Sequence, residues 1–232
     1  MTKVWYKENP ILFEEMKEEI KDVFPNLHFY LRNEVIVLEG SFPVVHDKAV
    51  LDRYSIKITF PKNYPDSVPV VEEVGGRIPR TFERHINPSG TACLFLPELR
   101  YEAWPPGSSF LEFLNGPVHN FFLGQSLVEN GGEWPFGTWD HGQKGTLDYY
   151  KQFFNTNDTN VVMRLLASVA IPKIRGHLPC PCGSGKITRY CHFSVLLDLK
   201  EKIPIDVVRR SFIALHQSLN NTKNEKRGKL SN

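Results

Sequence analysis

The first third of the chain changes from helical to strand-like spacing of its apolar residues. Apolar positions recur at helical spacing over residues 9–24, with Asn9 placed to cap and Pro10 in the first helical turn. Three strand-like runs follow, at 27–31, 34–38 and 54–60. Because short turns separate these runs, the pattern predicts a helix followed by an antiparallel meander.

The rest of the chain favours helices separated by irregular segments. Proline and glycine are frequent from 61 to 107, which indicates loops, where chemistry tends to sit. Ser109 then opens a capping box ahead of an apolar run, and Gly116-Pro117 is expected to break or kink that helix. The polar residues 221–232 are expected to be disordered. Further helices are expected at 146–154, 160–170 and 205–219.

Composition narrows the class of protein without identifying it. The chain has 232 residues, of which 41% are hydrophobic, enough to build a packed core. The formal net charge of +2 gives no reason to expect nucleic acid or an acidic membrane surface as a partner. The N-terminus lacks the apolar centre of a signal peptide, and no window reaches the roughly 18 apolar residues of a membrane span. We therefore expect a cytoplasmic protein with neither nucleic acid nor membrane as a partner.

Three of the four cysteines lie close together in the last quarter of the chain. Cys180, Cys182, Cys191 and His192 supply three sulfurs and one imidazole, the ligand set of a closed tetrahedral zinc site. Four protein ligands leave no open position, so Zn²⁺ is expected to be structural. The run Pro-Cys-Pro-Cys-Gly-Ser-Gly-Lys resembles the SEC-C motif, a small zinc module attached to many bacterial proteins. Such a module either recruits a partner or only stabilises a segment too small to bury its own core.

The fourth cysteine, Cys93, stands alone after the small residues Gly90, Thr91 and Ala92. These residues leave an open approach to a nucleophile, and the turn before them could bring the Asn87 amide towards the thiol. An amide placed there would donate to a developing oxyanion. The alternative is a buried structural cysteine, since cysteine is among the most buried residue types.

The order of motifs around Cys93 favours the nucleophile. After the helix and the meander come Tyr64-Pro65 with Pro69, His85-Ile86-Asn87, Cys93-Leu94, Trp104-Pro105 and the helix from Ser109. Over about residues 8–123 this order resembles the ubiquitin-conjugating (E2) family. Ile86 in place of a proline and a short interval from Asn87 to Cys93 are more similar to the divergent E2 proteins of bacterial conjugation and antiphage-defence operons. The segment from Trp134-Pro135 to His141 and Tyr150 shares in that likeness.

The resemblance implies an E2-type transferase. Cys93 would receive a ubiquitin-like protein as a thioester from an activating enzyme (E1-type) and pass it to an amine on a target protein, possibly a nucleotidyltransferase encoded beside it. Asn87 would support the oxyanion or the active-site loop, and His85 would brace that loop or act in catalysis. Tyr64, Pro65 and Pro69 would shape the turn beneath the site, with Trp104 packed near it. No organic cofactor would be needed, because ATP is consumed upstream.

Two other functions stay open. A non-catalytic E2-like module would bind or scaffold partners, and a cysteine hydrolase would pair Cys93 with His85 or His119 as base. His119 is otherwise expected to serve in packing. His141 could deprotonate an incoming lysine, or it could be a loop histidine that hydrogen-bonds the following helix.

These observations combine into one predicted architecture. The fold class is α+β, an E2-like antiparallel meander flanked by helices, with a small C-terminal zinc module and its helices. The expected division is a conjugating domain at 1–172, the zinc module with a helix at 173–220, and a disordered tail at 221–232.

Overall fold

The computed structural model describes residues 4–136 and 142–229, with side chains as far as residue 221. The described chain forms two compact units. Unit 1 takes in the chain up to Phe95 and the part from Ala103 to the gap at 137–141. Unit 2 takes in Leu96–Glu102 and the part after that gap.

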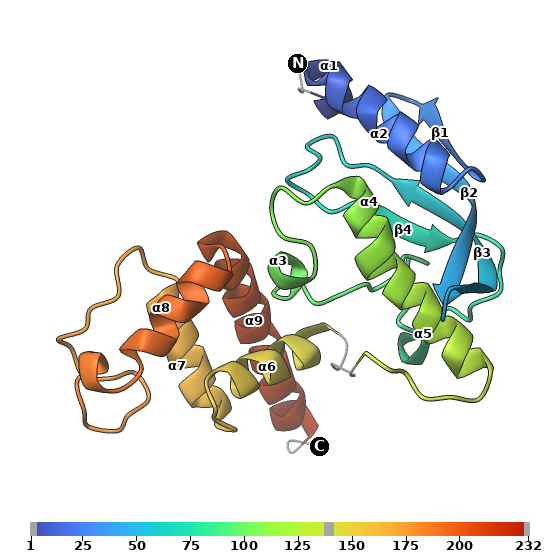
Figure 1. Ribbon diagram of the computed structural model, residues 1–232. Helices are drawn as coiled ribbons and strands as arrows, with labels where there is room; N and C mark the ends of the chain where they lie inside the picture. The colour runs from blue at the N-terminus through green and yellow to red at the C-terminus, as the bar shows by residue number, and fades with distance from the viewer. Residues whose placement is uncertain (1–3, 137–141, 230–232) are drawn as a thin grey trace. The chain divides into compact units, whose positions relative to one another are not determined.

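Unit 1 is built on a four-stranded antiparallel sheet (Figure 1). Two of its turns each contain two residues with positive φ: Asn33 and Glu34 in one, Asp47 and Lys48 in the other. Two-residue hairpin turns with this conformation match the twist of the strands that they join. The predicted antiparallel meander is therefore confirmed. The strands pair in chain order as β1 (Leu27–Arg32), β2 (Val35–His46), β3 (Ala49–Thr59) and β4 (Val70–Glu73).

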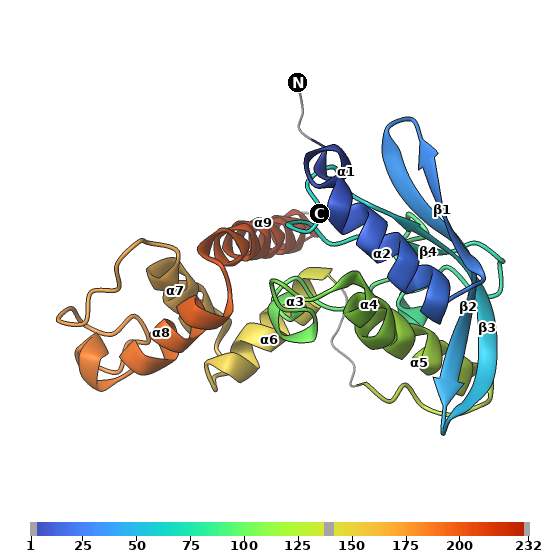
Figure 2. The same ribbon diagram turned by 45° about the horizontal axis from the view of Figure 1, so that its top comes forward.

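Helices cover one face of this sheet (Figure 2). The helix predicted at 9–24 is α2 (Pro10–Val23), and the Asn9 side chain caps it by accepting from the Leu12 amide at 3.2 Å. It lies beside α4 (Phe110–Phe113) and follows the short α1 (Trp5–Glu8), while α5 (His119–Glu129) packs on β2 and β3. The core between helices and sheet takes alternate positions of β3, where Tyr54, Ile56 and Ile58 are at most 1% exposed.

The helix that begins at Ser109 continues past Gly116-Pro117. Its predicted capping box is confirmed: the Glu112 amide donates to Ser109 Oγ at 3.1 Å, and the Ser109 amide donates to Glu112 Oε2 at 2.6 Å. One π-helical turn, η2 (Leu114–Val118), then contains Pro117 and joins α4 to α5. A wider turn accommodates a residue without an N–H, so the helix is locally distorted and does not end there.

In the described part of unit 2, four helices surround one apolar core. Asp158 starts α7 by accepting from the amides of Asn160 and Val161. The core includes Tyr150, Leu165, Leu166, Leu196, Leu199 and Val208. The four helices are α6 (Gly142–Phe153), α7 (Thr159–Val169), α8 (Phe193–Lys202) and α9 (Ile205–Lys229).

The segment Leu96–Glu102 belongs to unit 2 although unit 1 precedes and follows it along the chain. Glu98 is only 2% exposed. Its Oε1 accepts a hydrogen bond of 2.5 Å from the Ser211 hydroxyl of α9. Burial, followed by the nearby charge of Glu98, raises the pKa of Tyr150 far above its usual range. A buried carboxylate therefore joins this short segment to the last helix.

Two expected boundaries differ from the structure. The sequence places a domain boundary at 172, which would leave α6 and α7 in the first domain, but their apolar faces pack with α8 and α9. The tail expected to be disordered from 221 is helical as far as Lys229, because its lysine, glutamate and arginine residues are good helix formers. Within the described ranges, no helix combines the length and the apolar character needed to cross a membrane.

Candidate active site and metal centre

The loop that carries Cys93 is joined to the sheet by backbone hydrogen bonds. After the turn η1 (Phe82–Arg84), the chain folds back so that Ile86 forms a β-bridge with Ala92. The Ala92 amide donates to the Val71 carbonyl of β4 at 2.7 Å, and Thr91 forms a bridge with Glu72. The loop therefore continues the sheet at its β4 edge and holds Cys93 at a defined position.

Cys93 is half-buried, and its backbone is fixed by His85. The Cys93 amide donates to the His85 carbonyl at 2.8 Å. His85 itself has a left-handed backbone, with φ of 51°, where η1 ends. Burial raises the pKa of the Cys93 thiol above its ordinary value. The free thiol is therefore mostly protonated at neutral pH.

The Asn87 amide is turned towards Thr91. Its Nδ2 donates to the Thr91 carbonyl at 3.2 Å and to the Thr91 hydroxyl at 3.1 Å. The turn between these residues is closed by Gly90, which has φ of 88° and donates its amide to the Asn87 carbonyl at 2.8 Å. The side chain thus braces the loop that carries Cys93.

The three histidines singled out from the sequence have different surroundings. The His85 ring packs on Trp134 with its centroid 4.3 Å away. His119 Nε2 lies 2.8 Å from the carbonyl oxygen and 3.3 Å from the amide nitrogen of Val45, so its ring is engaged at the end of β2. His141 lies outside the described residues.

The Tyr-Pro turn and Trp104 form one aromatic group in the core of unit 1. Tyr64 is 6% exposed and its ring stacks on that of Trp104 at 6.2 Å. Trp104 also contacts Phe113 at 5.1 Å, and its indole N–H donates to the Ser109 carbonyl. Burial raises the pKa of Tyr64 above its usual range. These residues therefore link the turn at 64–65 to the start of α4.

Cys180, Cys182, Cys191 and His192 could hold a metal ion. Their ligand atoms all lie within 4.8 Å of one another. The Cys182 and Cys191 sulfurs are 3.6 Å apart, and His192 Nδ1 lies 3.4 Å from the Cys180 sulfur and 3.2 Å from that of Cys191. Tetrahedral sulfurs around Zn²⁺, with bonds of about 2.3 Å, would be about 3.8 Å apart. The distance between the Cys182 and Cys191 sulfurs is close to this value.

The chain around these ligands forms a small knuckle. Pro179 and Ile187 form a β-bridge, and the Cys180 amide donates to the Lys186 carbonyl at 2.8 Å. Arg164 of α7 donates to the Pro181 carbonyl at 2.6 Å, which ties the knuckle to the helical core. His192 directly precedes α8, so the fourth ligand is held by the start of a helix.

The thiols differ in how readily they ionise. Burial raises the pKa of the Cys180 thiol to about 11. At Cys182 burial acts in the same direction, but hydrogen bonds, with that of Ser184 first among them, outweigh it and lower the pKa to about 6. Since a metal is bound by thiolates, the Cys182 thiol is better prepared for binding than that of Cys180.

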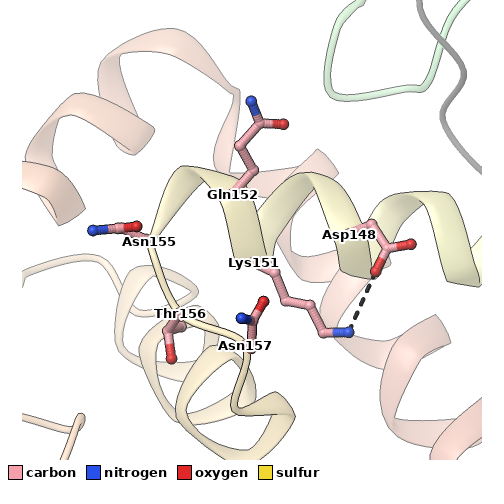
Figure 3. Close-up of a pocket in the computed structure, with 6 residues that line it drawn as sticks. All are labelled: Asp148, Lys151, Gln152, Asn155, Thr156 and Asn157. Carbon is pink, nitrogen blue, oxygen red and sulfur yellow. Dashed lines mark hydrogen bonds and ion pairs between the residues drawn. The ribbon is translucent and has the colours of Figure 1, made fainter.

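A polar pocket of about 360 Å³ at the end of α6 does not have the arrangement of a site. Figure 3 shows that Asp148 and Lys151 point toward one another, at 3.3 Å, whereas Gln152 and Asn155 point away from that pair. In most binding sites a few polar groups converge on one ligand position. The polar groups that line this pocket do not.

The contacts of Trp134 and Thr91 could not be foreseen from the sequence. Trp134 is distant from His85 along the chain, so their contact has no local signal in the sequence. The only hint is Gly124, because a glycine inside a helix often marks the close approach of a bulky group. Thr91 occurs in the sequence as a small neighbour of Cys93, with nothing to mark it as the acceptor for Asn87.

Comparison with known proteins gives no assignment for the chain. No family model matches it, and no curated protein or solved structure is similar enough to count as a match.

Proposed function

We propose that this chain is an E2-type acyl carrier that holds a ubiquitin-like protein as a thioester on Cys93. The observation that carries the proposal is the placement of Cys93, half-buried on a loop that is hydrogen-bonded to an antiparallel sheet with helices on one face. The order of motifs along the chain supports it independently. The resemblance to the E2 pattern covers about residues 8–123.

Two exchanges make up the proposed reaction. The Cys93 sulfur attacks the thioester carbonyl on the activating enzyme, a new C–S bond forms, the old one breaks, and the enzyme's thiol leaves with the proton that Cys93 gave up. An amine of the target then attacks the carbonyl, a C–N bond forms, and the Cys93 thiol is regenerated as the amine loses a proton. Neither exchange is an oxidation or a reduction.

The environment of Cys93 supports a carrier more than a hydrolase. A hydrolase needs a thiol that is activated by a neighbouring base. Here burial raises the pKa of Cys93, while the rings of His85 and His119 are engaged with Trp134 and Val45. A thiolate of high pKa is also a poor leaving group, so a thioester on Cys93 would resist hydrolysis until an amine is positioned beside it.

A non-catalytic scaffold is the second candidate, and the same burial of Cys93 favours it. A thiol that is mostly protonated at neutral pH is a weak nucleophile unless its proton is removed as it reacts. The two candidates differ in one outcome, because only a carrier becomes covalently attached to its modifier.

The proposal for the Cys-His cluster is a structural Zn²⁺. Three thiolates and one imidazole within 4.8 Å of one another suit this ion, and four protein ligands would leave no coordination position for a substrate. When bound, the ion would close the knuckle that links α7 to α8. We place no chemical step at the metal.

The test is intact-mass spectrometry of a Cys93→Ser variant purified from cells that also express its neighbouring genes. Serine should trap the modifier as an oxyester that survives reducing agent and is released by mild base. The matched control is Cys93→Ala, which has no nucleophile and should carry no adduct. An adduct on the serine variant alone supports the carrier. If the neighbours are expressed and active but no adduct forms, the scaffold becomes the better account.

A further inference from the structure

The position of Cys93 depends on a residue to which the proposed reaction assigns no role. The Cys93 amide donates to the His85 carbonyl at 2.8 Å, so any movement of the His85 backbone moves Cys93 with it. His85 has the left-handed conformation, which is uncommon for a residue other than glycine. What holds the His85 side chain therefore matters for Cys93.

Trp134 supplies that support. The His85 and Trp134 rings lie 4.3 Å apart between centroids, with an angle of 34° between their planes. Trp134 also contacts Phe121 of α5 edge-on at 6.1 Å. The tryptophan thus lies between the first residue of the Cys93 loop and a helix of the core, and the loop and the helix are far apart in the sequence.

Gly124 of α5 makes room for the tryptophan ring. A Cβ atom added at Gly124 would lie 2.6 Å from Trp134 Cζ3 and 2.8 Å from two other ring atoms. Real Cβ atoms do not approach so closely, so any side chain at this position would displace the ring. A helix interior otherwise disfavours glycine, which is a poorer helix former than alanine. The ring contact gives this glycine a structural reason.

We propose that Trp134, seated on Gly124, is a positioning residue that fixes Cys93 through His85. The ring orients His85, and the His85 carbonyl sets the depth at which Cys93 lies in the loop. Removing the ring would loosen the loop and expose the thiol. The significance of this for acyl transfer rests on the proposed function, whereas the effect on the thiol itself does not.

The test measures the reactivity of Cys93 directly. The full-length, zinc-loaded protein is treated with iodoacetamide across a range of pH values, and modification of Cys93 is followed by peptide mass spectrometry, which separates it from the three clustered cysteines. Gly124→Ala and Trp134→Ala should each alkylate at least about threefold faster than the parent protein at neutral pH, with the pH profile shifted to lower pH. Because both changes act through one ring, the double variant should be no faster than Trp134→Ala alone.

The matched control is Gly116→Ala, the same substitution earlier in the same continuous helix. A Cβ at Gly116 meets no atom within 4 Å, so this variant should alkylate like the parent. A general loss of stability would lower the unfolding temperature but would leave the pH dependence of Cys93 alkylation unchanged. If Gly124→Ala fails to fold, Trp134→Phe removes part of the ring without adding volume and should shift the profile in the same direction.

An unchanged Cys93 profile in folded Gly124→Ala, Trp134→Ala or Trp134→Phe protein overturns the proposal. This result is independent of the proposed function, because alkylation requires no modifier. The absence of an oxyester on Cys93→Ser would refute the carrier and leave the positioning role of Trp134 intact.

Discussion

The Asn87 amide makes two hydrogen bonds to Thr91, so it could donate to an oxyanion at Cys93 only by giving up at least one of them. A brace and an oxyanion donor make different demands on the same side chain. A brace acts in every state of the protein, whereas a donor acts only while charge develops on the carbonyl oxygen. The two hydrogen bonds from Asn87 to Thr91 favour the brace.

Asn87→Ala should destabilise unit 1 by about 1–2 kcal/mol, because it removes both hydrogen bonds from a part-buried loop. In a reconstituted conjugation assay, it should slow transfer to the amine more than it slows loading of Cys93. Thr91→Val is the matched comparison, since it removes the hydroxyl acceptor and keeps the carbonyl.

If Asn87 is mainly a brace, Thr91→Val should reproduce part of both effects. A donor role predicts instead that Thr91→Val transfers normally while Asn87→Ala does not. Transfer by Asn87→Ala at the parent rate would exclude any contribution of the amide to the reaction.

Among the elements of unit 1, a network of polar side chains joins the first half of β3 to the C-terminal end of α5. Arg77, in the connection after β4, donates to both carboxylate oxygens of Asp52 at 2.5 Å and to Glu129 Oε2 at 2.8 Å. Arg84 of η1 contacts the other oxygen of Glu129 at 3.3 Å. One end of the network therefore includes the turn that leads into the Cys93 loop.

This network predicts a dependence of stability on pH. The hydrogen bond from Arg77 is the largest influence on the pKa of Asp52, which lies below its ordinary value. A carboxylate with a lowered pKa in the folded state contributes its full stabilisation above its unfolded pKa of about 3.9 and loses it as the pH falls through the folded value. Arg77→Gln should therefore lower the unfolding temperature at neutral pH, and the difference from the parent should shrink below about pH 4.

The control for Arg77→Gln is Lys21→Gln, which removes an exposed ion pair with Glu18 on the surface of α2. Exposed pairs of this kind contribute little, so its melting temperature should match the parent at every pH. A difference for Arg77→Gln that persists unchanged in acid would contradict the assigned role of Asp52.

The elements that could be predicted from the sequence are those whose signals are local. The capping residues Asn9 and Ser109 and the alternation in β3 each predict their element. The sequence predicts β2 only as far as residue 38, because Gly40 and Pro43 interrupt its pattern and both residue types are atypical inside strands. The other features depend on tertiary contacts. One of them is the packing of the Trp134 ring against Gly124, which no local sequence pattern encodes.

At the scale of the whole molecule, the two units differ in what stabilises them. Unit 1 has a sheet and a large aromatic core. Unit 2 has a core of helices and a knuckle over 178–192 in which Cys180 and Thr188 are buried. A segment with so little buried surface would depend on the proposed Zn²⁺ for a defined structure.

Removal of the metal should therefore affect the units unequally. Treatment with a chelator should release one Zn²⁺ per chain and increase hydrogen exchange of backbone amides over 178–192 and the start of α8. The amides of β1 to β4 should exchange as before. Adding Zn²⁺ back should restore protection, which serves as the control for irreversible damage. Loss of protection in the sheet, or undiminished protection in the metal-free knuckle, would contradict this account.

The pairing of Glu98 with Ser211 has a consequence for synthesis on the ribosome. The two residues are 113 positions apart in the chain. At translation rates of about 5–20 residues per second, the hydroxyl is made roughly 6–23 seconds after the carboxylate. The segment Leu96–Glu102 follows Cys93 by a few residues. It must therefore leave the ribosome long before the rest of unit 2 has been synthesised. During that interval the nascent chain can complete its sheet, while the segment that follows the cysteine stays accessible to chaperones.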